Sequence, residues 1–138
     1  MFERVRDREI IVSKLEHAKQ LQDRTKMFAV RIIHAFAALP KLEAARIRHF
    51  LRSGTSVAPS YRAASRARSK AEFISKLGVV VEEAAEILFC LDLLVDSDLV
   101  RLEVVDALCI ERDELGRIFS SSLATAKSNR SIAQSPAR

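Results

Sequence analysis

Apolar residues recur every three or four positions along most of the chain, which is the spacing of amphipathic helices. The first clear run covers residues 23–39. Its apolar positions are Phe28, Ile32, Phe36 and Leu39. Asp23 offers an N-cap for this helix, and Pro40 is expected to end it because proline lacks a backbone N–H. Residues 1–22 are highly charged and carry a weaker helical pattern, so they are interpreted as a charged helical extension.

A second helix is predicted over residues 42–64. Its apolar and small positions are Leu42, Ile47, Phe50, Leu51, Gly54, Val57, Ala58, Tyr61 and Ala64. Glycine inside a helix costs about 1 kcal/mol relative to alanine, so Gly54 is expected to permit a close crossing between helices. Pro59 is expected to kink this helix, since it removes one backbone hydrogen bond.

Ser69 followed by Glu72 is a capping-box pattern, which predicts that a third helix begins there. Its main apolar positions are Phe73, Leu77, Val80, Val81, Ala84, Leu88, Leu91 and Val95. A polar turn is expected at residues 96–98, and a fourth helix then covers residues 102–123. Residues 128–138 are basic and rich in serine, and they are predicted to be a disordered tail.

Four amphipathic helices with short connections predict an all-α fold, an antiparallel up-down four-helix bundle over residues 23–127. The third helix also carries apolar residues off its main seam, so it either lies at the bundle centre or meets another subunit. The candidate oligomer-interface residues are Ile74, Val79, Ile87, Phe89 and Leu93.

The composition agrees with this fold class. The 138 residues correspond to one domain, 49% are hydrophobic, and only three are glycine and three proline. No run approaches the roughly 18 uninterrupted apolar residues that a membrane span needs. The N-terminal residues are too charged for a secretory signal, so we expect a cytoplasmic protein with Cys90 and Cys109 as reduced thiols.

Charge is segregated between the second and third helices. Residues 40–69 carry seven basic groups and one acidic group, whereas residues 70–98 carry two and seven. One interpretation is that arginines of the second helix pair with carboxylates of the third, within or between chains. The other is a surface that binds nucleic-acid phosphates. The candidate contact residues are Arg48, Arg52, Arg62, Arg66, Arg68 and Lys70.

Candidate catalytic chemistry is sparse. His17, His34 and His49 belong to no E-x-x-H or H-E-x-x-H motif, which excludes the ligand pattern of di-iron bundles and zinc proteases. Glu82 and Glu86 lie one helical turn apart, a spacing more typical of a solvated or ion-paired face than of a metal site. We therefore predict no catalytic residue, metal or cofactor, and a helical enzyme with a carboxylate site is the weakest alternative.

Five segments carry a family resemblance. They are DRTKMFAVRII (23–33), ALPK (38–41), LRSGTSVAPSYRAASRARSKAEFISKL (51–77), EEAAEILFCLDLL (82–94) and ERDELGRIF (111–119). Over residues 23–127 the chain resembles the bacterial four-helix bundle family first named for proteins encoded in intervening sequences of 23S ribosomal RNA genes. That family also contains the accessory protein of diversity-generating retroelements. The resemblance implies a ring-like homopentamer.

The resemblance also implies a role for some members as basic scaffolds that bind nucleic acid and a reverse transcriptase. From it and the charge pattern we expect a non-enzymatic oligomeric scaffold or adaptor that contacts RNA or DNA through its basic second helix. Because Tyr61 is the one aromatic residue near the basic cluster, binding is expected to follow the phosphate backbone. The alternative is a structural homo-oligomer, or an adaptor for a protein partner, whose arginine and glutamate faces pair with each other.

Overall fold

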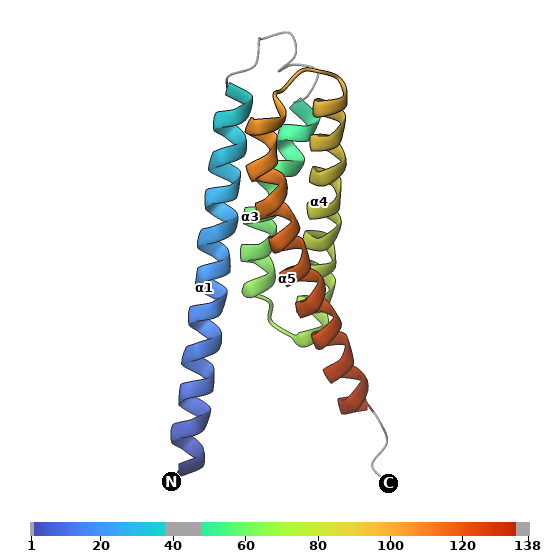
Figure 1. The fold of residues 1–138 in the computed structure, drawn as a ribbon. Helices are drawn as coiled ribbons and strands as arrows, with labels where there is room; N and C mark the ends of the chain where they lie inside the picture. Colours follow the sequence, from blue (N-terminus) through green and yellow to red (C-terminus); the bar gives the residue numbers. More distant parts are fainter. Residues whose placement is uncertain (1, 38–47, 135–138) are drawn as a thin grey trace.

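The computed structural model describes residues 2–37 and 48–134, which form four helices and no strand. The helices are α1 (Phe2–Ala37), α3 (Arg48–Ser65), α4 (Lys70–Asp96) and α5 (Leu102–Gln134). They run alternately up and down, so both ends of the chain lie at the same end of the molecule (Figure 1). Helix contacts follow the order α1, α3, α4, α5 and close from α5 back to α1. The prediction of a four-helix, all-α fold is confirmed.

The core is a column of apolar side chains to which all four helices contribute. In α4, buried residues recur at steps of three and four, as expected for one face of a helix packed against neighbours on both sides. The largest fully buried side chains are Phe28, Phe119, Ile32, Leu77, Leu115, Val57, Val80 and Val105.

α1 is longer than the sequence pattern indicates. Asp23, predicted to cap a separate helix, lies exposed in the middle of one continuous helix of 36 residues. No glycine or proline occurs between Phe2 and Ala37, so nothing in the backbone interrupts propagation from one half to the other. Residues 2–22, which the sequence predicts to be a charged helical extension, are therefore the first part of α1. The predicted stop at Pro40 and the start of the second helix at residue 42 lie outside the described residues.

α4 begins after Ser69, which is its N-cap as the sequence predicts: the backbone N–H of Glu72 donates to Ser69 Oγ at 3.1 Å. The Glu72 carboxylate accepts from the backbone N–H of Arg68 at 3.1 Å, one residue before the cap, whereas in a capping box it accepts from the N-cap residue itself. An N-cap of this kind contributes about 1 kcal/mol by satisfying an N–H group that lacks a partner within the helix. At the other end, the Ser97 N–H donates to Leu93 O at 3.0 Å and Asp98 takes a left-handed φ of 56°, which closes the predicted turn.

α5 continues to Gln134, so it covers residues 128–134 of the tail that the sequence predicts to be disordered. No glycine or proline occurs between Arg117 and Ser135, so nothing in the backbone chemistry of this segment interrupts the helix. Residues 135–138 lie outside the described residues.

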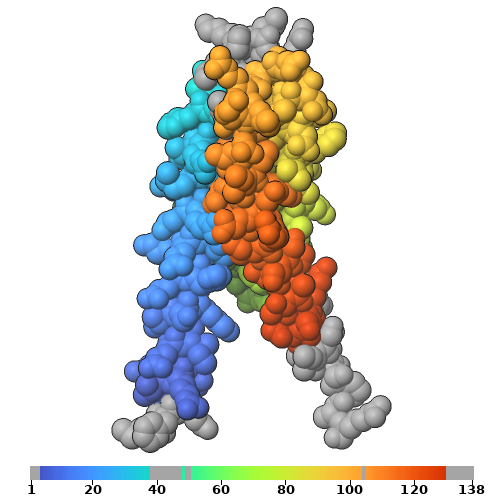
Figure 2. Space-filling model, viewed as in Figure 1, coloured from blue at the N-terminus to red at the C-terminus, as the bar shows by residue number. Residues whose placement is uncertain are grey.

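The bundle is uneven in length, because α3 has 18 residues whereas α1 has 36 and α5 has 33. The N-terminal half of α1 and the C-terminal half of α5 therefore extend past the turn between α3 and α4. Figure 2 shows that they diverge and leave a hollow between them. A groove of about 560 Å³ lies there, lined on one side by α1 and on the other by Tyr61, Phe73 and Leu77.

α1 and α3 cross closely at Gly54. A Cβ atom at this position would lie 2.6 Å from Cδ1 of the buried Ile32, which is closer than van der Waals contact allows. The close crossing expected from the helical glycine is therefore present. The helix continues through Pro59, which is exposed to solvent.

Replacing Gly54 with leucine is expected to lower the free energy of unfolding by about 1–3 kcal/mol, because the new side chain overpacks the contact with Ile32. Gly78→Leu is the matched control: a Cβ at Gly78 meets nothing within 4 Å, and a better helix former should leave stability unchanged or raised. Urea unfolding of both variants measures the difference. Equal stability of the two variants would contradict a packing role for Gly54.

Candidate nucleic-acid interface

A basic stripe runs along the outer face of α3 and onto the turn that follows it. It is defined here as Arg48, Arg52 and Arg62 of α3 together with Arg66, the first residue after the helix. All four side chains are exposed, and the spacing of the three helical arginines places them on the side of α3 opposite the buried Val57. They form two i,i+4 pairs separated by about 15 Å of helix, from the rise of 1.5 Å per residue. The four arginines predicted from sequence thus share one surface.

Arg68 and Lys70, the other two predicted contact residues, lie beyond the stripe. Arg68 is in the turn after α3, and Lys70 is the first residue of α4. Both are exposed, so they extend the basic surface at the end that carries Arg62 and Arg66. The positive charge of this surface is therefore denser near the turn than at the start of α3.

Serine hydroxyls, not arginines, satisfy the α4 carboxylates that face α3. Ser60 Oγ donates to Glu83 Oε1 at 3.0 Å, and Ser53 Oγ donates to Glu86 Oε2 at 3.3 Å. Within residues 2–37 and 48–134, no salt bridge joins α3 to α4. The described part of the chain thus gives no support to pairing of the basic and acidic helices inside one chain.

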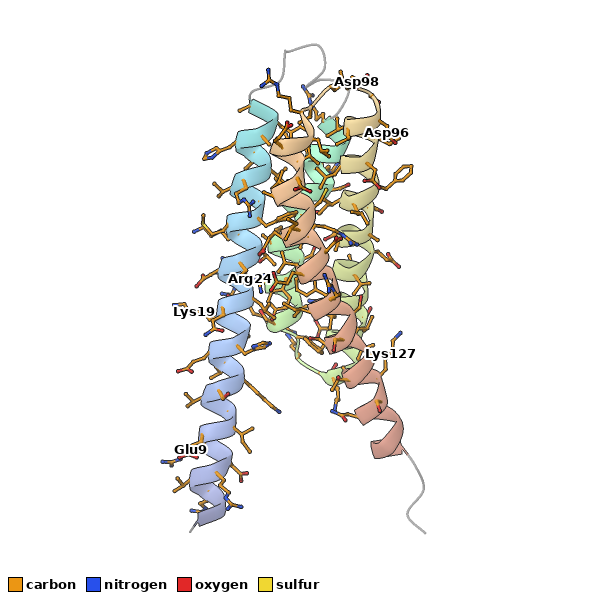
Figure 3. The ribbon with its side chains drawn as sticks, in the orientation of Figure 1. Glu9, Lys19, Arg24, Asp96, Asp98 and Lys127 are labelled. Atoms are coloured by element: carbon orange, nitrogen blue, oxygen red, sulfur yellow. The ribbon has the colours of Figure 1, made fainter. Side chains whose placement is uncertain are left out.

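Arginine–carboxylate pairing occurs between other helices. Arg24 of α1 donates from Nε and Nη2 to the Glu111 carboxylate of α5 at 3.1 Å each, and its Nη2 also lies 3.3 Å from Glu114 (Figure 3). The hydrogen bond with Glu111 is the main reason that the pKa of Arg24 is raised. Arg112 of α5 donates to the Ala84 carbonyl of α4 at 2.7 Å. These contacts join α5 to both of its neighbours.

The aromatic residue in the basic segment belongs to the core. Tyr61 is buried and its ring packs on Phe119, with ring centroids 5.3 Å apart. Burial also raises the pKa of its hydroxyl group. Tyr61 therefore has no free face on which a base could stack, and the basic stripe offers charge alone.

The predicted oligomer-interface residues divide into two groups. Ile74 and Ile87 are buried inside the chain, so the prediction that they lie off the main seam of α4 is wrong. The helix is covered by α3 on one side and by α5 on the other, which widens its buried face beyond one stripe. Val79, Phe89 and Leu93 remain exposed, Phe89 at 64%, and they form an outer apolar face on α4.

The two cysteine thiols lie in α4 and α5. Cys90 and Cys109 are free thiols, and burial raises the pKa of Cys90 to about 11, so this thiol is protonated at neutral pH. In the parts of the chain that the structure describes, no cluster of three histidine, cysteine or acidic side chains is placed to hold a metal ion. No described helix is both long enough and apolar enough to cross a lipid bilayer.

Sequence reasoning missed the contacts that depend on two helices at once. The Arg24–Glu111 pair spans 87 positions, and the bond from Ser60 to Glu83 spans 23. The available signal was the placement of small hydroxyl residues in α3 between its buried positions, because a serine beside a core stripe is positioned to reach a neighbouring helix.

Comparisons with known proteins support the fold. The crystal structure of a protein of unknown function from the S23 ribosomal protein family, from Bacteroides thetaiotaomicron, matches with a TM-score of 0.72 and 28% sequence identity. The match covers 78% of this chain and 97% of that chain. No protein-family model and no curated protein sequence matches. The chain thus resembles a protein of the S23 ribosomal protein family in both fold and sequence.

Glu83 provides a test of the contact between α3 and α4. Burial raises the pKa of its carboxyl group, and the charges of Glu86 and Glu82 raise it further, whereas the hydrogen bond from Ser60 opposes the shift. Its Oε2 atom is buried without a hydrogen-bond partner. Since folding favours the protonated form, ionisation of Glu83 costs stability at neutral pH, and the cost disappears below its unfolded pKa of about 4.3.

We therefore expect Glu83→Gln to raise the urea midpoint at pH 7, with a gain that shrinks as the pH falls and vanishes below about pH 4. The control is Asp106→Asn, which removes an exposed carboxylate of α5 and should not raise the urea midpoint at pH 7. A midpoint for Glu83→Gln that falls at pH 7 would show that the ionised carboxylate stabilises the fold.

Proposed function

We propose that this protein is a non-enzymatic scaffold that binds the phosphate backbone of nucleic acid through the basic stripe of α3. The observation that carries the proposal is the exposure of three arginines on one face of α3 and of Arg66 directly after it, with none of the four paired to a carboxylate in the described part of the chain. Like-charged i,i+4 pairs cost a few tenths of a kcal/mol each, and a bound anion removes that cost.

The acidic helix does not cancel this surface. Glu83 and Glu86 face α3 and accept hydrogen bonds from serines at the interface between the helices. Glu72 pairs with Lys76 on α4 itself, at 2.8 Å. The outer face of α3 is therefore free to attract phosphates.

The chemistry of the stripe favours contact with the backbone rather than with bases. Arginine forms two parallel hydrogen bonds with a phosphate, and the ring of Tyr61 is buried and so is not exposed for stacking. Binding should therefore depend weakly on sequence and strongly on salt. Four phosphate contacts correspond to a slope of log K against log[salt] of about −3.6 for duplex DNA and about −2.8 for single strands.

RNA is the first ligand to test, because the similar protein from Bacteroides thetaiotaomicron is assigned to a ribosomal protein family. We extend this to the narrower proposal that the chain belongs with the proteins of 23S ribosomal RNA intervening sequences. A fragment of 23S ribosomal RNA and a duplex DNA of equal length are suitable probes.

The double substitution Arg62→Glu and Arg66→Glu reverses two charges of the stripe. It is expected to weaken RNA binding at least tenfold and to reduce the slope of log K against log[salt] by about 2, because two phosphate contacts are lost. Fluorescence anisotropy of labelled RNA and duplex DNA, titrated at several salt concentrations, measures both quantities. The native mass of the variant should not change.

The matched control is Lys19→Glu together with Arg101→Glu, which changes the net charge equally at exposed positions outside α3. Figure 3 shows Lys19 on α1. Equal loss of affinity in both double variants would show that net charge, not the stripe, attracts RNA. Loss of native mass in the Arg62 and Arg66 variant, with RNA affinity unchanged, would favour the alternative in which these arginines pair with carboxylates of another subunit.

A scaffold also needs a means of assembly, and the outer apolar face of α4 supplies one. We propose that Val79, Phe89 and Leu93 contact a second subunit in a ring-like homopentamer. Large exposed apolar side chains that recur along one helix face are typical of a protein interface.

Replacing Phe89 and Leu93 together with glutamate is expected to reduce the native mass, because two charges would be buried at the proposed interface. Size-exclusion chromatography with light scattering measures the mass, and circular dichroism checks that the helices remain. Retention of the wild-type mass would show that this face is not the interface between subunits.

A further inference from the structure

The N-terminal half of α1 carries an apolar face that none of the other described helices, α3, α4 and α5, covers. Val5, Val12 and Leu15 are each more than half exposed, Leu15 at 66%. Their spacing of seven and three positions returns them to one side of the helix. In a globular monomer such a face normally packs against another element.

The groove at the diverging end of the bundle joins this face to the core. Ile11, Leu15 and Ala18 line its α1 side, and they continue upstream from the buried Leu21. The opposite wall includes Phe73 at the start of α4. α3 ends at Ser65, so no third helix fills the space that Figure 2 shows between the two long helices.

The charges along this segment suit an identical helix in the opposite direction. Residues 3–19 carry five basic and four acidic side chains, so the segment lacks the strong positive charge that would attract a polyanion. Arg8 and Glu16 are both exposed and lie four positions on either side of Val12. An antiparallel pair centred at Val12 brings Arg8 of each helix opposite Glu16 of the other, whereas a parallel pair places arginine beside arginine.

We propose that the α1 helices of two copies of this chain pair antiparallel about a two-fold axis at Val12. The contact is the same on both subunits, so it covers both apolar faces at once. The paired segments are about 30 Å long, and Val5 of each copy packs on the aliphatic stem of Lys19 of the other. This dimer contact is separate from the basic stripe and from the outer face of α4.

Disulfide formation tests the geometry directly in the full-length chain. Under mild oxidation Val12→Cys is expected to give a dimer band on a non-reducing gel, since residues on a two-fold axis meet their own counterparts. Lys19→Cys should give no more dimer than the wild-type chain, because the two thiol-bearing residues would lie about 21 Å apart along the pair, beyond the reach of a disulfide. Equal cross-linking at both positions would instead show a parallel pair and would overturn the proposal.

A second measurement does not depend on oxidation. Replacing Val12 and Leu15 together with glutamate should halve the native mass measured by light scattering, or halve the number of rings per particle, while RNA binding per chain stays within about twofold. The control replaces Leu102 and Ile110 of α5 with glutamate. These two apolar residues are about as exposed as Val12 and Leu15, and their replacement should leave the native mass unchanged. An unchanged mass in the α1 variant, or no cross-link at Val12, would overturn the proposed pairing. The apolar face of α1 would then be a candidate contact surface for a different protein.

Discussion

A carboxylate that faces a packed neighbouring helix needs hydrogen-bond donors from that helix. Which residues of α3 donate to the α4 carboxylates decides whether the arginines of α3 stay at the surface. Glu83 and Glu86 of α4 face α3, a helix that contains both arginines and serines. Serine hydroxyls take that role, because serines lie beside the core stripe of α3 while its arginines lie on the opposite side. The acidic helix and the basic helix thus pack together without neutralising each other, and the positive charge of α3 remains at the surface.

A second constraint is the difference in length between the helices. The N-cap at Ser69 and the end of α3 at Ser65 fix where the chain turns, so α3 ends and α4 begins well before the N-terminal end of α1 is reached (Figure 1). Below that turn the bundle has two long helices that diverge and cannot cover each other's apolar faces (Figure 1). The upper part is a closed four-helix core tied by the contact of Gly54 with Ile32 and by the ion pairs of Arg24. The lower part presents a groove and an uncovered stripe.

These two constraints place the candidate functions on different parts of one molecule. The proposed phosphate-binding surface is the outer face of α3, the proposed ring contact is the outer face of α4, and the proposed pairing of copies uses the N-terminal half of α1. Each surface belongs to a different helix, so each can be altered without touching the others. A scaffold needs this separation, because assembly and ligand binding must occur together. The similarity to a protein of the S23 ribosomal protein family extends over most of the chain and agrees with such a bundle.

The sequence by itself determined the helical fold, the N-cap at Ser69, the turn after Asp96 and the need for a small residue at Gly54. These features depend on local spacing and backbone chemistry, which neighbouring residues decide. The tertiary structure alone decided that Ile74 and Ile87 are core residues, since burial of α4 depends on two flanking helices. It also decided that Ser53 and Ser60, rather than arginines, contact the α4 carboxylates, and that α1 continues unbroken past Asp23. Those outcomes depend on how each helix is rotated about its axis and on how long it is. Rotation and length decide which distant residues meet, and the periodicity of apolar residues does not determine either of them.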